Sequence, residues 1–270
     1  MSEIKVFTAK AIHTMEPSHP HGTAIAVRDG QILEVGTPES LRPWLDRHPH
    51  KIDAQFADKV LLPGFIDPHL HPSMAAVILP MQFITALKWD LPWEKVPATK
   101  THEDYLARLK ELADTGDSAP FFTWGYHRNW HGHVTRTQLD ATCPDRPVIV
   151  WHRSFHEVIM NSAAIAHFKL DTNEIGGHPQ INLTDGLFYE NGLRIAINAL
   201  NPIIMSPEVF GLGMERLKQV THFGGHTTVG DMGIGIFNFD LEWQAAQMVF
   251  TPETTPFRVH YTPNVLALAH

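Results

Sequence analysis

From residue 60 onward, short apolar runs alternate with amphipathic helical stretches. This order restricts the possible folds of the chain more than any other feature of the sequence. The predicted strands cover residues 60–67, 121–125, 146–151, 227–231 and 257–261, and the predicted helices cover residues 103–115, 161–168, 191–200, 207–223 and 241–250. Repeated strand, crossover and helix units are typical of a parallel sheet with helices packed on it. The pattern predicts an α/β fold, either an open sheet or a barrel. The first strand is continuously apolar around Pro63-Gly64, so we expect it to be buried on both faces.

The first 60 residues follow a different pattern of short alternating runs. Asp29-Gly30 separates two of these runs, which is a strong signal for a β-hairpin. Thr37-Pro38 marks the start of a short helical piece that extends to Asp46. We therefore predict a small antiparallel β unit over residues 1–60, beside a larger domain over residues 61–270.

The composition is that of an ordinary globular protein, with 43% hydrophobic and 19% charged residues. Lys and Arg number 21 against 29 Asp and Glu, and the net charge of -8 opposes nucleic-acid phosphates, so we expect no nucleic-acid partner. The chain has no secretory signal and no run near the ~20 apolar residues of a membrane helix, so we expect no membrane partner either. The single cysteine, Cys143, fits a reducing compartment, and the expected location is cytoplasmic.

The segment from Pro63 to Pro72 carries the strongest chemical signal. His69 and His71 stand two residues apart at the predicted end of a strand, so both imidazoles point to the same side. Two imidazoles on one side can bind a divalent cation in a water-accessible site. The chain has 19 histidines, so such a pair also arises by chance, and the pair alone leaves both interpretations open.

Several motifs, taken in order, resemble the metal-dependent amidohydrolase superfamily, specifically its amidohydrolase family 3 branch. Members typically carry Pro-Gly-Phe-Ile-Asp-x-His-x-His after an N-terminal β segment, and residues 63–71 match this motif. The later matching motifs are Asp145-Arg146-Pro147-Val148, Ser154-Phe155-His156, Asn161-Ser162, Gly186-Leu187 with Glu190, and Gly225-His226-Thr227-Thr228-Val229-Gly230-Asp231. The resemblance therefore extends over nearly the whole chain.

The resemblance implies a partial (β/α)8 TIM-type barrel over residues 61–270 and a small N-terminal β-sandwich-like unit, which relatives complete with the C-terminal end of the chain. It also implies one or two divalent metal ions, usually zinc, with His69 and His71 as ligands. In the family a carboxylated lysine or equivalent group, two later histidines and an aspartate general base complete the site. A metal ion polarises a carbonyl group and lowers the pKa of bound water toward ~7. The implied reaction is hydrolysis of a non-peptide carbon–nitrogen bond in a small amide, an N-formyl or N-acyl compound, or a cyclic amide.

The chain ends at His270, whereas a barrel of this kind takes ~250 residues by itself and relatives run to about twice the length of this chain. The motifs that hold the lysine, the later histidines and the catalytic aspartate have no match here, so the catalytic residues are expected beyond His270. Two explanations stay open: a truncated product, or a half that assembles with a complementing C-terminal half or as a homo-oligomer. The alternative function is a catalytically incomplete fragment or a non-catalytic binding module of the same fold.

Three further residues, His156, Trp130 and Asp231, are predicted to contact a small-molecule substrate. His156 follows a predicted strand and would face the mouth of a barrel; alternatively it orders the loop toward Asn161, which caps the next helix. Trp130 lies in a loop with histidines at positions 127, 131 and 133. This loop forms either a rim over the substrate or a zinc or nickel site.

Each of two acidic residues has two possible roles that the sequence does not distinguish. Asp231, at the end of a predicted strand, orients a ligand or accepts hydrogen bonds from the backbone of Met232–Gly235. Glu190 lies near the mouth or opens the helix over residues 191–200, where a negative charge is favourable.

Overall fold

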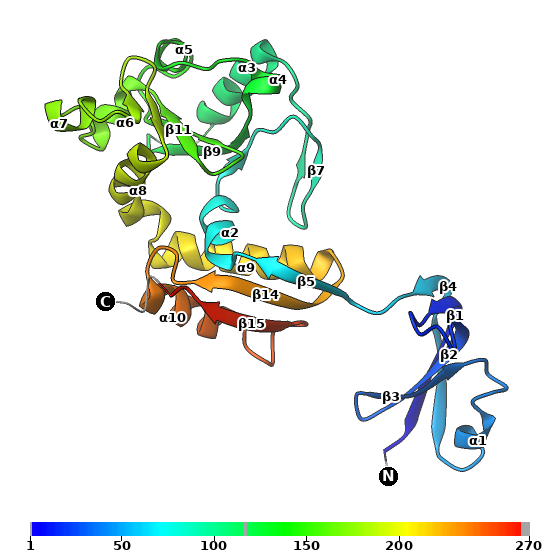
Figure 1. The fold of residues 1–270 in the computed structure, drawn as a ribbon. Helices are drawn as coiled ribbons and strands as arrows, with labels where there is room; N and C mark the ends of the chain where they lie inside the picture. Colours follow the sequence, from blue (N-terminus) through cyan, green and yellow to red (C-terminus); the bar gives the residue numbers. More distant parts are fainter. Residues whose placement is uncertain (1, 116–117, 266–270) are drawn as a thin grey trace. The chain divides into compact units, whose positions relative to one another are not determined.

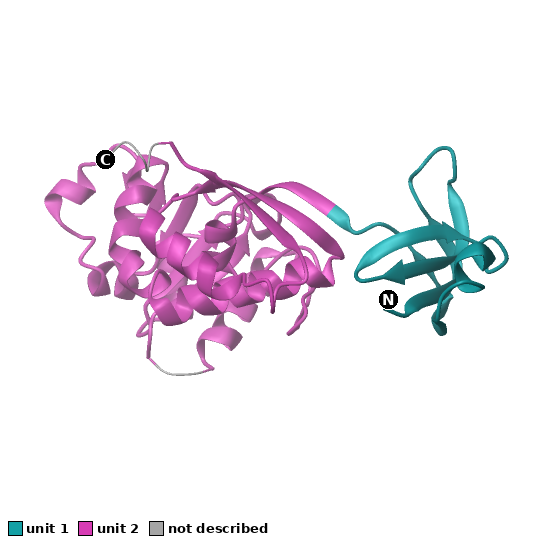
Figure 2. Cartoon of the chain, turned by 90° about the horizontal axis from the view of Figure 1, so that it is seen from below, with its two compact units in different colours: residues 1–65 teal, residues 66–270 magenta. Residues whose placement is uncertain are grey.

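The computed structural model describes residues 2–115 and 118–265 and divides into two compact units, residues 1–65 and residues 66–270 (Figure 2). Unit 1 has a small core of its own, built around Ile4, Val6 and Leu41. Unit 2 contains two larger sheets and the two-stranded sheet of a hairpin. Each unit therefore has its own sheet structure and its own buried residues.

Unit 1 is one four-stranded sheet with one short helix. Its elements are β1 (Ile4–His13), β2 (His21–Arg28), β3 (Gln31–Gly36), α1 (Arg42–Leu45) and β4 (His50–Leu61), in the sheet order β3-β2-β1-β4. The predicted hairpin is confirmed: Asp29 and Gly30 have φ of 52° and 75°, as a two-residue turn between twisted strands requires.

One expectation for this unit is wrong. The sheet is not purely antiparallel, because the chain returns through α1 and β4 pairs in parallel with β1. The described residues of unit 1 form a single sheet, which is one layer, so a sandwich-like unit that other parts of the protein complete stays a prediction.

The first sheet of unit 2 has the order β15-β14-β5. Its strands are β5 (Phe65–Leu70), β14 (His226–Ile234) and β15 (Arg258–Pro263), and the helices packed in this region are α2 (Pro72–Ile78), α9 (Pro207–Phe223) and α10 (Phe239–Val249). β14 and β15 pair in parallel, and all three arrows point the same way in Figure 1. Gly213 of α9 lies directly against the backbone of Ala76 in α2, so these two helices pack very closely.

The second sheet of unit 2 is formed by residues that lie between α2 and α9 in the sequence. Its strands, in the order β12-β13-β11-β10-β9-β6, are β6 (Gln82–Phe83), β9 (Phe121–Tyr126), β10 (Val148–His152), β11 (Glu157–Met160), β12 (Ile181–Asn182) and β13 (Leu187–Tyr189). β6, β9 and β10 run in parallel, whereas β11, β13 and β12 pair antiparallel.

The described residues form a mixed α/β fold without a closed barrel, so the partial TIM-type barrel stays a prediction. The predicted strands over residues 121–125 and 146–151 exist, but they lie in a different sheet from β5 and β14. The chain turns back at residues 153–156, and β11 takes the edge of β10 that a further parallel strand would need. Unit 2 is therefore mixed α/β, and its two larger sheets are one all-parallel sheet and one mixed sheet.

The remaining elements of unit 2 surround the second sheet. They are the hairpin β7 (Trp89–Asp90) and β8 (Lys95–Val96) and the helices α3 (His102–Ala113), α4 (Arg128–His131), α5 (Arg136–Thr142), α6 (Ser162–His167), α7 (Asn173–Gly176) and α8 (Asn191–Ile204). The predicted helices are confirmed, and α9 has the predicted bounds because Ser206 caps its start and Gly225, at φ 77°, follows its end. The cap role considered for Asn161 is also confirmed, because its Oδ1 accepts from the N–H of Ala164 at 2.9 Å.

The expectation that the first apolar strand is buried on both faces is wrong. β4 ends at Leu61 and β5 begins at Phe65, and the side chain of Ile66 is 69% exposed. β5 is an edge strand of its sheet, so it lacks the neighbours that bury a central strand.

Within the described residues, no single helix has both the length and the apolar character to cross a membrane. α8 and α9 reach that length and composition only as a pair, and the chain bends by 91° between them.

Candidate metal centre

The two histidines predicted as metal ligands lie side by side at the carboxyl end of β5. Nε2 of His69 is 3.2 Å from Nε2 of His71, and the rings meet edge to face with centroids 5.0 Å apart. Oδ1 of Asp67 accepts a hydrogen bond from the backbone N–H of His69 at 3.1 Å, which holds the strand end. Pro72 then opens α2, where its fixed φ suits the first helical position. The local sequence therefore brings both Nε2 atoms to one point.

His71 is the more enclosed residue of the pair. Its Nδ1 is buried and has no hydrogen-bond partner among the described residues. A Cβ atom at Gly233 of β14 would lie 3.7 Å from this Nδ1, so β14 passes close to the ring. Burial lowers the pKa of His71, and the neighbouring His69 lowers it further. The neutral imidazole, which is the form that binds metals, is therefore favoured.

The separation of the two nitrogens fits a single divalent ion. A nitrogen ligand lies ~2.1 Å from zinc, so two nitrogens 3.2 Å apart subtend an angle of about 100° at the ion, which is close to tetrahedral. No group of three or more His, Cys, Asp or Glu side chains in the described ranges 2–115 and 118–265 could hold a metal. The pair therefore supplies two ligands, and a full coordination shell needs further groups.

Asp231 lies buried at the end of β14, 2% exposed. Its Oδ1 accepts a hydrogen bond from the N–H of Gly233 at 3.1 Å, which is the second of the two roles considered for it. Its partner in β15, Tyr261, contacts Trp243 of α10, so both side chains face that helix. Burial raises the pKa of Asp231 to about 6, and nearby Glu242 adds to the shift. A contact with substrate stays a prediction.

The raised pKa of Asp231 makes the stability of unit 2 depend on pH. Below about pH 4 the carboxyl is neutral in both folded and unfolded chains, but as the pH rises through about 6 the folded chain must bury a charge. We expect Asp231→Asn, which stays neutral, to gain about 2 kcal/mol relative to wild type between those pH values. Urea unfolding of both proteins at the two pH values measures this difference, and parallel pH profiles would contradict it.

His156 and Glu190 form an exposed pair at the turn before β11. Nδ1 of His156 is 3.3 Å from Oε1 of Glu190, and the N–H of Glu190 donates to the carbonyl of His156 at 3.1 Å. Glu190 and Phe155 have φ of 48° and 68°, a region that costs such residues about 1–3 kcal/mol each. Within the described residues, no hydrogen bond or ring contact joins this pair to His69 or His71. The predicted substrate contact of His156 stays a prediction.

Glu190 also occupies one of the two positions considered for it. It is the residue that precedes the first turn of α8, although its side chain makes no capping hydrogen bond there. The negative charge at this helix start agrees with the favourable electrostatics that were expected.

Trp130 was expected in a loop but lies in the short helix α4 that follows β9, where it is 40% exposed. The guanidinium of Arg153 lies 5.8 Å from the centre of its ring, and the ring of His127 lies 4.8 Å from it. Trp130 lines a small hollow of about 30 Å³ together with Trp89 and Trp124. These apolar faces agree with a rim over a substrate, and direct contact stays a prediction.

The alternative metal site in the loop of residues 127–133 is not formed. His131 is fully buried, with Nε2 donating to the carbonyl of Thr99 at 2.8 Å and Nδ1 accepting from the N–H of His127 at 3.0 Å. Because both ring nitrogens are engaged, His131 stabilises the loop and is not free to bind a metal.

Sequence reasoning missed Glu242 of α10. This residue is 1% exposed, and its carboxylate accepts hydrogen bonds from the Ser73 hydroxyl at 2.6 Å and from the backbone N–H groups of residues 235–238 at 2.6 to 3.2 Å. It therefore ties α2, which follows the two histidines, to the loop that follows β14. The available signal was one acidic residue between Leu241 and Trp243 in a predicted amphipathic helix.

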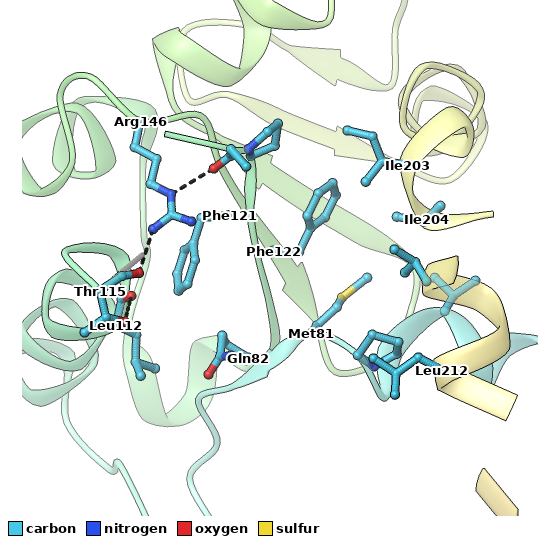
Figure 3. Close-up of a pocket in the computed structure, with 15 residues that line it drawn as sticks. Met81, Gln82, Leu112, Thr115, Phe121, Phe122, Arg146, Ile203, Ile204 and Leu212 are labelled. Atoms are coloured by element: carbon cyan, nitrogen blue, oxygen red, sulfur yellow. Dashed lines mark hydrogen bonds between the residues drawn. The ribbon is translucent and has the colours of Figure 1, made fainter. Parts of the chain in front are cut away.

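A large cavity lies away from these residues, at the amino ends of β6 and β9 (Figure 3). Its volume is about 470 Å³, and the side chains that line it include Met81, Phe122 and Ile204. Arg146 at its edge donates to three backbone carbonyl groups within residues 113–119 and stacks on Phe121. None of the described residues that line it is a predicted site residue, so this cavity is not part of the candidate site.

Comparison with known families gives one match over most of the chain. Residues 52–261 match the profile described as the amidohydrolase family. The matched range includes the segment with His69 and His71 as well as β14 and most of β15.

Comparison with curated proteins gives more distant relatives. The exoenzymes regulatory protein AepA of Pectobacterium carotovorum subsp. carotovorum is 25% identical over 242 residues, which cover 84% of this chain and 49% of that protein. The N-substituted formamide deformylase of Arthrobacter pascens is 26% identical over 185 residues, which cover 66% of this chain and 30% of that enzyme. The chain thus spans half or less of the length of these relatives.

Two solved structures share the fold. One is an uncharacterized metal-dependent hydrolase from Pyrococcus horikoshii OT3, with a TM-score of 0.65 and 18% identity over 97% of this chain and 48% of that chain. The other is an uncharacterized metal-dependent hydrolase from Pyrococcus furiosus, with a TM-score of 0.64 and 20% identity over 96% of this chain and 50% of that chain. At this identity the likeness concerns the fold alone.

Proposed function

Since the chain belongs to the amidohydrolase family, branch 3, we propose that it acts in a metal-dependent hydrolase of carbon–nitrogen bonds other than peptide bonds. The observation that carries this proposal is the 3.2 Å separation of the Nε2 atoms of His69 and His71. The rest of the coordination shell and the general base come from groups outside the described residues.

The residues of this chain would hold the ion and keep its ligands in place. His69 and His71 would bind a divalent metal, expected to be zinc, through their Nε2 atoms, and burial keeps His71 neutral for that role. When bound, such an ion polarises a carbonyl group and lowers the pKa of water toward ~7. Asp67 orients the strand end, and Glu242 anchors α2 through Ser73. Both contacts preserve the approach of the two imidazoles.

The proposed substrates are small amides, N-formyl or N-acyl compounds, or cyclic amides. One relative is named for deformylation of N-substituted formamides, which supports cleavage of a carbon–nitrogen bond in a small molecule. The single cysteine, Cys143, is buried and unpaired, which supports a reducing, cytoplasmic setting for the reaction.

In this proposal the sheet β15-β14-β5 is the first part of a (β/α)8 barrel. Its strands run in one direction, and β15 is an edge whose outer backbone groups can pair with another strand. The apolar side chain of Met232 is 44% exposed and that of Ile66 is 69% exposed. Further parallel strands, from a complementing polypeptide or a second copy, would cover these groups and bring the missing ligands.

The metal site is tested by the zinc affinity of the purified chain, measured by competition with a chromogenic chelator. We expect the double variant His69→Ala/His71→Ala to lose more than about tenfold in affinity, because both ligands are removed. The matched control is His48→Ala/His50→Ala, which removes a second pair with the same spacing from unit 1. Equal affinity of both double variants would refute the metal site.

A further inference from the structure

A second cavity lies where the carboxyl ends of strands from the two larger sheets of unit 2 meet. Its volume is about 400 Å³, within the range of small-molecule sites. Phe155 follows β10, Ile236 and Phe237 follow β14, and Met74 lies one helical turn after His71. α8 forms the other wall, close to the loop after β14 (Figure 1). The start of α2, which follows His71, and the loop after β14 thus both line this cavity.

One face of α8 supplies the polar side of the cavity. Arg194, Asn198 and Asn201 recur at intervals of three and four residues, so they share one side of the helix. Arg194 is exposed and makes no ion pair or side-chain hydrogen bond within the described ranges. Oδ1 of Asn201 is buried, also without a hydrogen-bond partner in the part of the chain that is described. A free guanidinium and an unsatisfied amide oxygen therefore face the same cavity.

The opposite wall is apolar and held in place. Phe155 adopts φ 68°, and its ring lies 4.8 Å from that of Trp151. The N–H groups of Ile236 and Phe237 both donate to Glu242, which also binds Ser73, the neighbour of Met74. One buried carboxylate thus positions two parts of this wall.

The chemistry of the lining selects a ligand with three features. Among the described residues, Arg194 is the only charged residue that lines this cavity, and a guanidinium binds a carboxylate through two parallel hydrogen bonds. Oδ1 of Asn201 can accept a hydrogen bond only from a donor such as an amide N–H. Phe155, Phe237 and Met74 offer contact to an apolar group.

We propose that this cavity is a substrate subsite that recognises amides bearing a carboxylate and an apolar group, with Arg194 as the specificity-determining residue. This inference rests on the proposed function, because the amide bond is placed toward His69 and His71. The carboxylate binds Arg194, the amide N–H donates to Asn201, and the apolar group packs on the aromatic wall. Neutral amides of the same shape lose the first of these contacts.

The test uses binding by the full chain and needs no turnover. The probes are N-acetylphenylalanine and its neutral analogue N-acetylphenylalaninamide, with Kd measured by NMR titration. We expect wild type to bind the carboxylate at least about tenfold more tightly, since a charge-assisted contact of that kind contributes on the order of that factor. Arg194→Gln is expected to abolish the preference, and Arg194→Lys to keep part of it.

The control variant is Arg47→Gln, which makes the same change of charge at an exposed position in unit 1 and should keep the preference. Equal binding of both probes by wild type, or an unchanged preference in Arg194→Gln, would overturn the inference. The same titration in His69→Ala/His71→Ala separates it from the proposed function. If wild type binds zinc but does not prefer the carboxylate probe, only the subsite is wrong. If wild type prefers the carboxylate probe but does not bind zinc through His69 and His71, only the metal site is wrong.

Discussion

Replacing Gly213 with alanine is expected to destabilise unit 2 by about 3 kcal/mol, because the new methyl group has no space. A Cβ atom at this position would fall on the backbone carbonyl of Ala76, where α9 crosses α2. Backbone cannot rotate away as a flexible side chain can, so the two helices would have to move apart. The free energy of unfolding from urea denaturation measures the effect.

The same helix offers a matched control at Gly211. A Cβ atom there would meet nothing within 4 Å, so Gly211→Ala makes the identical chemical change in open space. Alanine in a helix interior is favoured over glycine by about 0.5–1 kcal/mol, and we expect Gly211→Ala to stabilise the chain by that amount. Opposite signs for the two variants support the close packing, and similar effects would refute it.

Local patterns allowed most of the helices and one hairpin to be predicted from sequence. The bounds of α9 follow from a serine cap, Pro207 at the first helical position and Gly224-Gly225 at its end. The hairpin at Asp29-Gly30 follows from the φ values that such a turn requires. These signals are contained within a few residues, so they do not depend on what the rest of the chain does.

Strand pairing was not predictable in the same way. The apolar character of β10 gives its strand identity, but whether its neighbour is parallel depends on the turn at residues 153–156 and the return of β11. The apolar sequence of β5 predicts a buried strand, yet β5 forms the edge of its sheet. Pairing is decided by contacts between distant segments, which periodicity does not encode.

The candidate site shows the same division. The proximity of His69 and His71 follows from their spacing on one strand, as predicted. The contact of Ser73 with Glu242, in contrast, joins residues 169 positions apart, and the cavity beside Arg194 combines four separate segments. The sequence alone does not predict that these residues lie together, because folding brings distant segments into contact.

Replacing Glu242 with alanine is expected to have a larger effect, a loss of about 4 kcal/mol in the free energy of unfolding of unit 2. The change leaves the Ser73 hydroxyl and the N–H groups of residues 235–238 without their acceptor in a buried region. Asp240→Ala removes an exposed acid from the same helix and should cost less than about 1 kcal/mol. Urea denaturation of the two variants compares them directly.

Glu242→Gln tests whether the carboxylate charge or only its shape holds this region together. Each carboxylate oxygen accepts from at least two donors, so an amide keeps one acceptor and turns a donor toward the N–H groups that faced the other. We therefore expect an intermediate loss of stability, about half that of alanine. Because Glu242 positions the segment after His71 and the wall formed by Phe237, the folded glutamine variant should also bind zinc and N-acetylphenylalanine more weakly. Wild-type affinity for both ligands would mean that Glu242 stabilises the fold without positioning the site.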